Sequence, residues 1–543
     1  MFAKHSRRLR LSVFGLMVLI ALAGCGTAAT PSATTAPSQP QATTAPQTSG
    51  TPKVLVVGSG QDVENLDPHT GNTYSIRAIQ RNVYDALLRY EGNPAKIVPH
   101  LAESWDVSAS GLEYSFKLVK TAKFHDGTPV TADAVQFSFN RLLKLKKGVS
   151  FMFTDVMDMN SVQVIDPYTV KIKLTKPFAP FLSVVPWLWV ANPKVVQANA
   201  GSDDGQTWLK DHEAGSGPFV IKRWEIGNLY ELERTKDYWK TAGAGNLTGA
   251  IWKIIRETSS ARLALQKGDI HLATDFSGDD MDALKGQPGI VLVEQPEFRT
   301  FSIKMNMLSG PLADINMRRA VSYAFDYQAM LDAEGAGHAE LMIGPLPNGI
   351  LGADPKLAVP RQDLNKAKEF LAKSNNPNGG VKLSYVYVTG LEIERKFGLI
   401  LLDSLKKLNI DLEIKQMVFP DMVALSKKPE TTPDLFPVYQ TANYADPDNV
   451  AFAAYHGSQN GNWTNPTYNS PQANALIDKA RTTLGDDARA KLYADFQTQV
   501  VNDAPDIFGV LEKRKLAFRD SVQNWQFVPI ASNAIEFYPL SLK

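Results

Sequence analysis

The chain has 543 residues, with 57 Lys or Arg, 56 Asp or Glu and a hydrophobic fraction of 44%. The balanced charge excludes a nucleic-acid binder that relies on bulk charge, and the apolar content excludes a disordered chain. A single Cys excludes a disulfide scaffold.

Residues 1–24 predict a secretory signal peptide. Four basic residues lie within the first ten positions, and an apolar stretch over 11–24 follows them and ends in small residues. As a helix this stretch spans only ~21 Å, whereas the hydrocarbon core of a membrane is ~30 Å thick. It is therefore too short to be a comfortable transmembrane anchor.

The one Cys defines the kind of signal peptide. Leu22-Ala23-Gly24-Cys25 resembles the bacterial lipobox, in which the Cys thiol is acylated and becomes the first residue of the mature chain. The alternative, a buried and unmodified Cys, is disfavoured by this position. Because two or more acyl chains suffice for stable anchoring, we expect a lipid anchor at Cys25. The protein would then stand at the outer face of the cytoplasmic membrane, in the cell envelope or periplasm.

Residues 25–52 are predicted to comprise the lipidated Cys and a disordered linker. From Gly26 to Pro52 the chain contains only Ala, Thr, Pro, Ser, Gln and Gly. Such a segment cannot bury a hydrophobic core. As a flexible tether it would span ~30 Å on a root-mean-square average.

Strand patterns dominate the first half of the body that follows. Helical three-four spacing from Ile76 to Leu87 predicts a helix. Apolar and polar residues then alternate from Leu112 to Leu118, which is the period of a half-buried strand. A similar alternation over 170–174 follows an Asp166-Pro167 turn and predicts a hairpin with residues 162–164.

The second half predicts a strand, helix, strand unit. Alternating segments over 381–387 and 410–414 flank a helical stripe from Phe397 to Leu408. The two strands should be parallel and their connection right-handed. Ligands of such sheets lie beyond the carboxyl ends of the strands. This points towards the strand predicted over 435–440 and the loop after it.

Several motifs follow one another from about Lys53 to the C-terminus. They include Leu101-Ala102-Glu103-Ser104-Trp105, Lys123-Phe124-His125-Asp126-Gly127-Thr128-Pro129-Val130, Gly215-Ser216-Gly217-Pro218-Phe219 and Asp446-Pro447-Asp448-Asn449. In this order they resemble the extracellular solute-binding proteins of bacterial ABC importers, family 5. That family serves oligopeptides, dipeptides, nickel chelates and some oligosaccharides.

The resemblance implies an α/β fold of the two-lobed, periplasmic-binding-protein-like type (class II), with mixed sheets and a hinge between the lobes. By that analogy lobe I comprises residues 53–298 plus 512–543, and lobe II comprises residues 299–511. The ligand would be enclosed between them.

The resemblance also points to one ligand-binding position. In peptide-binding relatives, an aspartate ahead of the Asp-Pro-Asp-Asn turn pairs with the α-ammonium of the peptide. Aligned on Asp446, that position here is Asn443. An amide accepts a hydrogen bond from an ammonium but brings no negative charge, so a neutral, hydroxyl-rich ligand gains weight. Replacing Asn443 by Asp should improve peptide binding if a free amine docks there.

Five residues are the expected ligand-binding set. They are Asn443, Tyr444, Thr441, Tyr74 and Trp463. Aromatic rings suit both the apolar side chains of a peptide and the faces of a sugar. Packing within the core or between lobes is the alternative role, and we expect it for at least half of the aromatic residues near the cleft.

A catalytic reading is disfavoured. His125 beside Asp126 could act as a general base, but Asp126-Gly127 predicts a tight turn and Thr131 a helix cap for residues 132–143. The eight histidines lack metal-site spacing, so we expect no metal and no cofactor. A secreted hydrolase would need a carboxylate pair, a nucleophile elbow or a metal motif, and we find none.

The sequence therefore predicts a lipid-anchored substrate-binding component of an ABC importer, not an enzyme. It would capture a peptide-like solute between two lobes and deliver it to the permease complex in the membrane. An oligosaccharide is the alternative cargo, and a metal chelate a lesser one. A surface protein for a macromolecular partner would instead expose a large apolar patch. We expect a monomer without a nucleic-acid partner.

Overall fold

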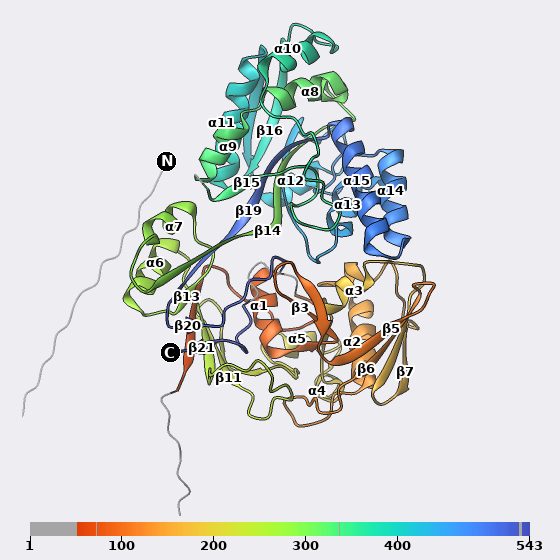
Figure 1. Cartoon of the computed structure of the whole chain (residues 1–543), viewed down its shortest axis with the longest axis vertical. Helices are drawn as coiled ribbons and strands as arrows, with labels where there is room; N and C mark the ends of the chain where they lie inside the picture. Colours follow the sequence, from red (N-terminus) through yellow and green to blue (C-terminus); the bar gives the residue numbers. More distant parts are fainter. Residues whose placement is uncertain (1–51, 72, 336, 531–534) are drawn as a thin grey trace, which may run out of the picture. The chain divides into compact units, whose positions relative to one another are not determined.

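The computed structural model describes residues 52–71, 73–335, 337–530 and 535–543. The predicted signal peptide, Cys25 and the linker up to Thr51 lie outside the described residues. Residues 52–543 form one compact unit, drawn in Figure 1.

An eleven-stranded mixed sheet organises this unit. Its strands are β1 (Val54–Ser59), β10 (Phe219–Glu225), β11 (Leu229–Arg234), β12 (Gly249–Ile254), β13 (Leu272–Ala273), β14 (Ile290–Met305), β15 (Ala339–Leu341), β16 (Val381–Val388), β17 (Ile410–Met417), β18 (Leu435–Thr441) and β19 (Asp506–Arg519). The strand order is β10-β11-β12-β1-β13-β19-β14-β18-β16-β17, and β15 also pairs with β19. β1 is parallel to both of its neighbours, whereas β14 and β19 are antiparallel. The sheet is therefore mixed, as predicted.

The two longest strands, β14 and β19, run side by side through the middle of the sheet (Figure 1). Their register shifts between Pro296 and Thr300, opposite Lys513 and Leu511. Such a shift, a β-bulge, bends a strand and increases its twist. The lobe boundaries predicted at 298/299 and 511/512 coincide with this shift. The division of the chain into those two lobes stays a prediction.

A second sheet has four antiparallel strands, in the order β5-β6-β8-β7. These are β5 (Ala102–Val107), β6 (Glu113–Leu118), β7 (Val162–Asp166) and β8 (Thr169–Lys173). Val164 pairs with Val170, which confirms the predicted hairpin. Three two-stranded pairs complete the strands: β2 (Asp85–Ala86) with β9 (Trp189–Val190), β3 (Leu88–Glu91) with β4 (Lys96–Pro99), and β20 (Val522–Gln523) with β21 (Ser541–Leu542).

Helices connect and cover the strands. The α-helices are α1 (Tyr74–Val83), α2 (Ala132–Leu145), α3 (Phe181–Val184), α4 (Pro193–Ala198), α5 (Gln206–Leu209), α6 (Thr258–Lys267), α7 (Gly278–Leu284), α8 (Ile315–Ala324), α9 (Tyr327–Glu334), α10 (Leu364–Ala372), α11 (Glu392–Lys406), α12 (Phe419–Leu425), α13 (Asp448–Tyr455), α14 (Pro471–Thr482) and α15 (Asp486–Asp503). The 3₁₀ turns are η1 (Ser150–Met152), η2 (Val185–Trp187), η3 (Pro311–Ala313) and η4 (Gly457–Gln459).

Two helix predictions need correction. The helix predicted over 76–87 ends at Val83, because Tyr84 turns to an extended conformation and the next residues pair with β9 as β2. Thr131 precedes α2 as predicted, but its side chain makes no capping hydrogen bond, and the helix continues to Leu145 instead of ending at residue 143.

The predicted strand, helix, strand unit is confirmed as β16, α11 and β17. β16 and β17 pair in parallel from Val381 opposite Ile410 to Val388 opposite Met417. β18 lies on the other side of β16, also parallel to it, and ends at Thr441. The loop over 442–447 therefore leaves the carboxyl-terminal edge of this part of the sheet.

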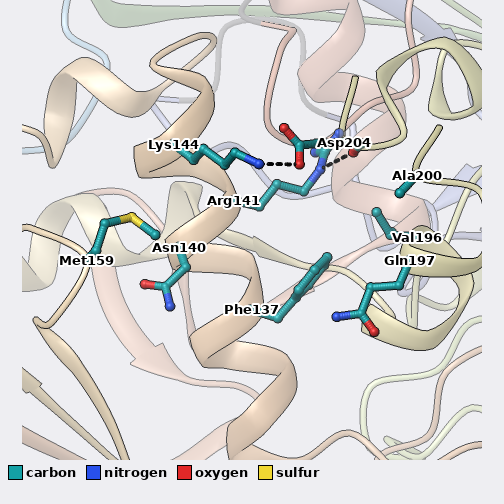
Figure 2. A pocket seen from close by; sticks show the side chains of 9 residues that line it. All are labelled: Phe137, Asn140, Arg141, Lys144, Met159, Val196, Gln197, Ala200 and Asp204. Atoms are coloured by element: carbon teal, nitrogen blue, oxygen red, sulfur yellow. Dashed lines mark hydrogen bonds and ion pairs between the residues drawn. The ribbon is translucent and has the colours of Figure 1, made fainter. Parts of the chain in front are cut away.

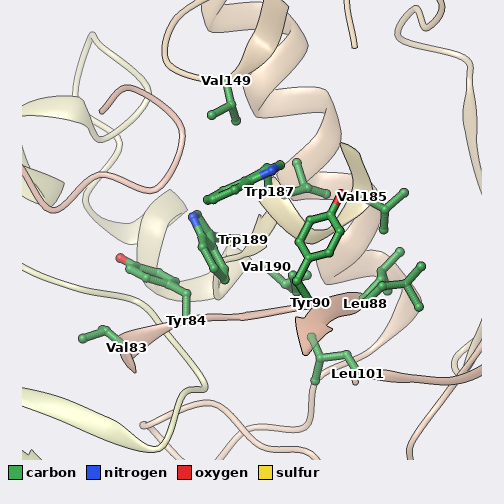
Figure 3. Close-up of a cluster of buried hydrophobic side chains, with 14 of the residues drawn as sticks. Val83, Tyr84, Leu88, Tyr90, Leu101, Val149, Val185, Trp187, Trp189 and Val190 are labelled. Atoms are coloured by element: carbon green, nitrogen blue, oxygen red, sulfur yellow. The ribbon is translucent and has the colours of Figure 1, made fainter. Parts of the chain in front are cut away.

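The buried apolar side chains form several clusters. The largest draws on residues 55–272, on Val293 and Tyr444 and on the last part of the chain, and Figure 3 shows some of its side chains, among them Trp187 beside Trp189. A second cluster is built from β14, β16, β18 and the helices α8 and α11. None of the helices in the described ranges combines the length and hydropathy of a membrane span.

Candidate functional site

The loop after β18 contacts segments that lie hundreds of positions earlier in the chain. Thr441 closes the ladder opposite Arg299 of β14, and the backbone N–H of Ala442 donates to the Phe298 carbonyl at 2.7 Å. These bonds fix the start of the loop. The residues that follow are thereby directed towards α1 and β3.

Asn443 meets α1 through a side-chain hydrogen bond. Nη2 of Arg77 donates to Oδ1 of Asn443 at 3.1 Å, and the guanidinium lies 4.6 Å from the centre of the Trp187 ring. The backbone N–H of Asn443 donates to Oδ1 of Asn449 at 2.9 Å, which holds the loop in place. Arg77 is buried, with 4% of its surface exposed.

Tyr90 makes a second contact with the loop after β18. Its hydroxyl accepts from the backbone N–H of Ala445 at 3.2 Å and donates to the Ser183 carbonyl. Burial raises the pKa of Tyr90 well above its usual value, so the hydroxyl stays protonated and can donate. We call the region where residues 441–481 contact residues 77–183 the junction.

A cavity of about 360 Å³ lies in the junction. It is lined from one side by residues of η1 and by Phe178, and from the other by the start of α13 and by Arg481: Phe151, Met152, Asp155, Val156, Phe178, Tyr444, Asp448, Asn449, Phe452, Ala453, Ser458, Gln459 and Arg481. Apolar rings with a few charged groups are the usual lining of a small-molecule site.

Arg481 spans this cavity. Its guanidinium lies 3.6 Å from the ring centre of Phe452 and 5.2 Å from that of Phe178. It forms ion pairs with Asp448 at 3.1 Å and with Asp155 at 3.6 Å. Its backbone carbonyl accepts from the N–H of Ala179 at 2.7 Å. Arg481 therefore contacts both sides of the junction.

The two aspartates of the Asp-Pro-Asp-Asn motif differ in role. Asp446 forms a bidentate pair with Arg489 of α15, at 2.6 and 2.7 Å, and accepts from the N–H of Asp448 at 2.9 Å. It therefore shapes the turn. Asp448 is fully buried and accepts from the Tyr444 hydroxyl at 2.9 Å. Burial raises the pKa of Asp448 to about 6, although Arg481 opposes the shift.

The five residues of the predicted binding set are not all brought together. Asn443 and Tyr444 lie in the junction, next to Thr441, and Tyr74 is the first residue of α1. Trp463 instead packs edge to face on Phe419, with 5.5 Å between ring centres, beside a small cluster of β16 and β18. A ligand contact for each of the five stays a prediction.

The segment around His125 is held by structural contacts. Its Nδ1 lies 2.7 Å from Oε1 of Glu213 and its Nε2 lies 2.9 Å from the Gly217 carbonyl. Gly127 has a φ of +83°, which favours glycine, and Asp126 accepts from the N–H of Thr128 at 2.9 Å. Burial lowers the pKa of His125, but Glu213 more than offsets this effect and the pKa lies above its usual value.

A further hollow of about 250 Å³ lies beside α2 (Figure 2). Nζ of Lys144 pairs with Asp204 at 2.5 Å, and Nε of Arg141 donates to the Asp204 carbonyl at 2.9 Å. All the lining residues belong to the segment 137–204, so this hollow receives nothing from the loop after β18. Among the described residues, no group of three His, Cys, Asp or Glu could hold a metal ion.

Sequence reasoning missed Arg77 and Arg481, two cationic side chains that make contacts across the junction. One signal for Arg77 was available. It is a cation in the first turn of a predicted helix, where the helix dipole is unfavourable for positive charge. Arg481, in the last turn of α14, is placed as an ordinary helix would place it, so its position gave no such signal.

The fold is that of the periplasmic binding proteins. A solved structure of HbpA2 from Haemophilus parasuis matches with a TM-score of 0.80 and 24% identity, covering 90% of this chain and 100% of that chain. The periplasmic binding protein DppA from Helicobacter pylori, solved in complex with the peptide STSA, matches with a TM-score of 0.75 and 24% identity, covering 90% and 98%. The predicted fold class is confirmed.

The chain belongs to the bacterial extracellular solute-binding proteins, family 5, whose middle region matches residues 96–462. A similar relative is the probable D,D-dipeptide-binding periplasmic protein DdpA of Escherichia coli K12. It is 29% identical over 496 residues, covering 90% of this chain and 94% of the relative. The family resemblance inferred from the motifs is confirmed, and the protein is a solute-binding component of transport instead of an enzyme.

Proposed function

We propose that this protein is the lipid-anchored substrate-binding component of an ABC importer, and that it captures a peptide-like solute at the junction for delivery to the membrane permease. The observation that carries the proposal is the pairing of Asn443 with Arg77, because it joins the position expected to bind ligand to a segment 366 positions away. Family membership supports the class of activity.

Capture would proceed by closure of two lobes, residues 53–298 plus 512–543 and residues 299–511. The register shift at Pro296–Thr300 between β14 and β19 is a suitable bending point. On opening, the bonds of Asn443, Ala445 and Arg481 across the junction would separate. A cargo that binds both lobes favours the closed state by the difference in its affinity for the two states.

A peptide is the first candidate cargo. One relative is named for a D,D-dipeptide, and one neighbouring structure was solved with a peptide. An oligosaccharide is the second candidate, favoured by the neutral amide of Asn443, which can bind hydroxyl groups as well as amines.

Native mass spectrometry of gently purified protein tests the proposal, because enclosed cargo often remains bound. We expect added masses in the range of short peptides, and a rise in melting temperature when di- to pentapeptides are added at 100 times their Kd, equivalent to about 2.7 kcal/mol. Small-angle scattering should show compaction on binding. Cleavage of the peptides, or a thermal response to none of the peptides or oligosaccharides, would contradict it.

The lipid anchor has a separate test. Mass spectrometry of the membrane fraction should find a mature N-terminus at Cys25 that carries diacylglycerol. The matched variant Cys25→Ser should leave the membrane fraction. A mature chain without lipid at Cys25 would exclude the anchor while leaving the binding proposal intact.

A further inference from the structure

The cavity of the junction has apolar walls on both sides. Phe151, Met152 and Phe178 line it from one part of the chain, and Phe452 and Ala453 of α13 line it from the other. Aromatic rings attract one another beyond the area that they bury, so these walls suit another flat, apolar group. The cavity volume of about 360 Å³ exceeds the ~150 Å³ of a protein cavity that holds benzene. There is therefore room for one aromatic side chain and the peptide group next to it.

Two of these rings keep apolar surface that the chain itself does not cover. Phe151 is 51% exposed, although the next residue, Met152, is buried, and Phe452 is only partly buried. A single exposed apolar side chain on an open face needs no explanation, but both of these rings line one cavity. An apolar ligand there would displace water from the rings and from its own surface, which is the source of hydrophobic stabilisation.

The charged side chains that line the cavity are already paired. Arg481 lies 3.1 Å from Asp448 and 3.6 Å from Asp155. Asp155 also pairs with Lys176 at 2.8 Å. A charged cargo group would have to break one of these pairs to find a partner of its own, and removal of one partner from a buried pair is costly. The cavity therefore favours an uncharged group.

Asn449 gives the cavity a hydrogen-bond donor. It lines the cavity and is 7% exposed. Its Oδ1 accepts from the N–H of Asn443 at 2.9 Å, which fixes the orientation of the amide, and its Nδ2 has no acceptor among the described residues. A peptide carbonyl would satisfy this donor. A sugar carries several hydroxyl groups on each ring, and every one of them needs a partner when it is buried, so the cavity suits a peptide better than an oligosaccharide.

We propose that the junction cavity binds an aromatic side chain of the cargo, and that the protein therefore selects peptides that contain an aromatic residue. The ring of the cargo lies against Phe151 and Phe452, and Nδ2 of Asn449 donates to a carbonyl of the peptide. The inference rests on the proposed function, because it names the class of cargo that the junction takes.

The test compares peptides that differ in one side chain. One set of synthetic di- to pentapeptides contains only Ala, and the other carries one Phe at each position in turn. The full chain is incubated with each set, native mass spectrometry identifies the bound peptides, and calorimetry gives their Kd. Because burial of an aromatic side chain stabilises a complex, we expect the best Phe peptide to bind at least about fivefold more tightly than the Ala peptide of equal length. A smaller difference would overturn the inference and leave the proposed function standing.

Failure of the peptide cargo gives a different result. If neither set binds, a peptide cargo is contradicted and the inference is overturned with it. Cellobiose and cellotetraose in the same assay identify the alternative, because binding of these neutral sugars without binding of any peptide would assign the junction to an oligosaccharide.

A variant that fills the cavity locates the preference there. Ala453→Leu should weaken the best Phe peptide at least about fivefold, because the larger side chain occupies the space of the ring, and it should change the affinity for the Ala peptide little. The control Ala494→Leu makes the same exchange at a partly exposed position of α15 that is not part of the lining, and should change neither affinity.

A second variant decides if Ala453→Leu does not fold. Because Phe151 is half-exposed, Phe151→Ala should leave the melting temperature of the free protein unchanged. It removes one wall of the cavity, so the Phe peptide should bind at least about threefold more weakly. The control Leu263→Ala in α6 starts from the same exposed fraction, 51%, and should leave the affinity unchanged. An unchanged affinity of Phe151→Ala for the Phe peptide would overturn the proposal.

Discussion

Two buried aspartates of this protein have pKa values that are shifted in opposite directions. Asp85 in β2 is 1% exposed and Asp448 in α13 is fully buried. Four side chains donate to Asp85: His100 at 2.7 Å, Tyr238 at 2.9 Å, and Ser216 and Trp239 at 3.0 Å. Burial raises the pKa of Asp85, but the charge and hydrogen bond of His100 and the other donors outweigh it, so the pKa is lowered.

Asp448 has fewer donors and a more divided environment. Tyr444 donates to one oxygen, and Arg481 lies near the other while it also reaches Asp155 across the junction. Burial therefore dominates and raises the pKa of Asp448 to about 6. The difference shows that a buried carboxylate is stably charged only where its donors are fixed around it. In the junction, Arg481 is shared between Asp448 and Asp155, and the pKa of the Asp448 carboxyl group is raised.

Removing the well-satisfied aspartate should have the largest effect. Asp85→Ala leaves four donors without their acceptor, two of them on the buried His100 and Ser216, so we expect the free energy of unfolding to fall by about 3–5 kcal/mol. Urea denaturation measures it. The exposed Asp106→Ala should stay within about 0.5 kcal/mol of wild type. A loss below about 1 kcal/mol for Asp85→Ala would show that these donors do not stabilise the buried Asp85 carboxylate.

The raised pKa of Asp448 predicts that the stability of the protein depends on pH. Because its folded pKa of about 6 lies above the ordinary value of 3.8, the native state keeps a proton that the unfolded chain loses between these values. Stability from this group is present below the ordinary value and is lost as the pH rises through about 6. One pKa unit corresponds to about 1.36 kcal/mol. Between pH ~4 and pH ~8, the free energy of unfolding of wild type should therefore fall by about 3 kcal/mol relative to that of Asp448→Asn.

Urea titrations at the two pH values check this prediction. Asp106→Asn, at an exposed position, is the matched control. An equal destabilisation by Asp448→Asn at both pH values would mean that the Asp448 carboxylate is as well satisfied as that of Asp85.

His125 is a base whose shifted pKa also makes the stability depend on pH. Its folded pKa is raised, so its contribution to stability is present below its ordinary pKa of about 6.5 and is lost as the pH rises through the folded value. His125→Ala should lower stability by about 2 kcal/mol at pH ~6 and by less at pH ~9. Cargo affinity should change little. An unchanged melting temperature with lost binding would show that His125 serves the ligand. The exposed His212→Ala is the control.

The smallest effect concerns the exposed ion pair of the junction. Asp155 is half-exposed, pairs with Lys176 at 2.8 Å and lies 3.6 Å from Arg481. Exposed pairs of this kind contribute about 0–1 kcal/mol, so Asp155→Asn should change the free energy of unfolding by less than about 0.5 kcal/mol. Calorimetry in low and high salt checks it. A larger, salt-dependent loss that Lys176→Gln does not reproduce would indicate that charge, instead of the stacking on Phe178 and Phe452, holds Arg481 across the junction.

Local patterns predicted the local structure well. The period-two alternation of 381–387 and 410–414 and the helical stripe between them specified β16, α11 and β17, because each pattern lies within one element. The same holds for the hairpin of β7 and β8. The end of α1 was misjudged because Leu87 continues the helical spacing beyond Val83, while the pairing of Asp85 with Val190 ends the helix.

Contacts between distant residues could not be read in this way. Asn443 was predicted only because a motif marked the loop, whereas its partner Arg77 lies in a segment whose periodicity describes the buried face of α1. Hydrophobic patterns predict which residues are buried. The charged residues of the junction contact residues from another part of the chain, and a hydrophobic pattern does not predict such contacts. A single sequence does not contain that pairing.

The ladder of β14 and β19 has a consequence for how the chain acquires its structure. β19, at residues 506–519, is the central neighbour of both β13 and β14, yet it follows all the other strands of the large sheet in chain order. Until it is made, the large sheet is split between its β1 side and its β16 side, with an uncovered edge on each. Completion of the sheet must therefore wait for the synthesis of β19, and loss of this one strand would leave β13 and β14 without the neighbour that joins them.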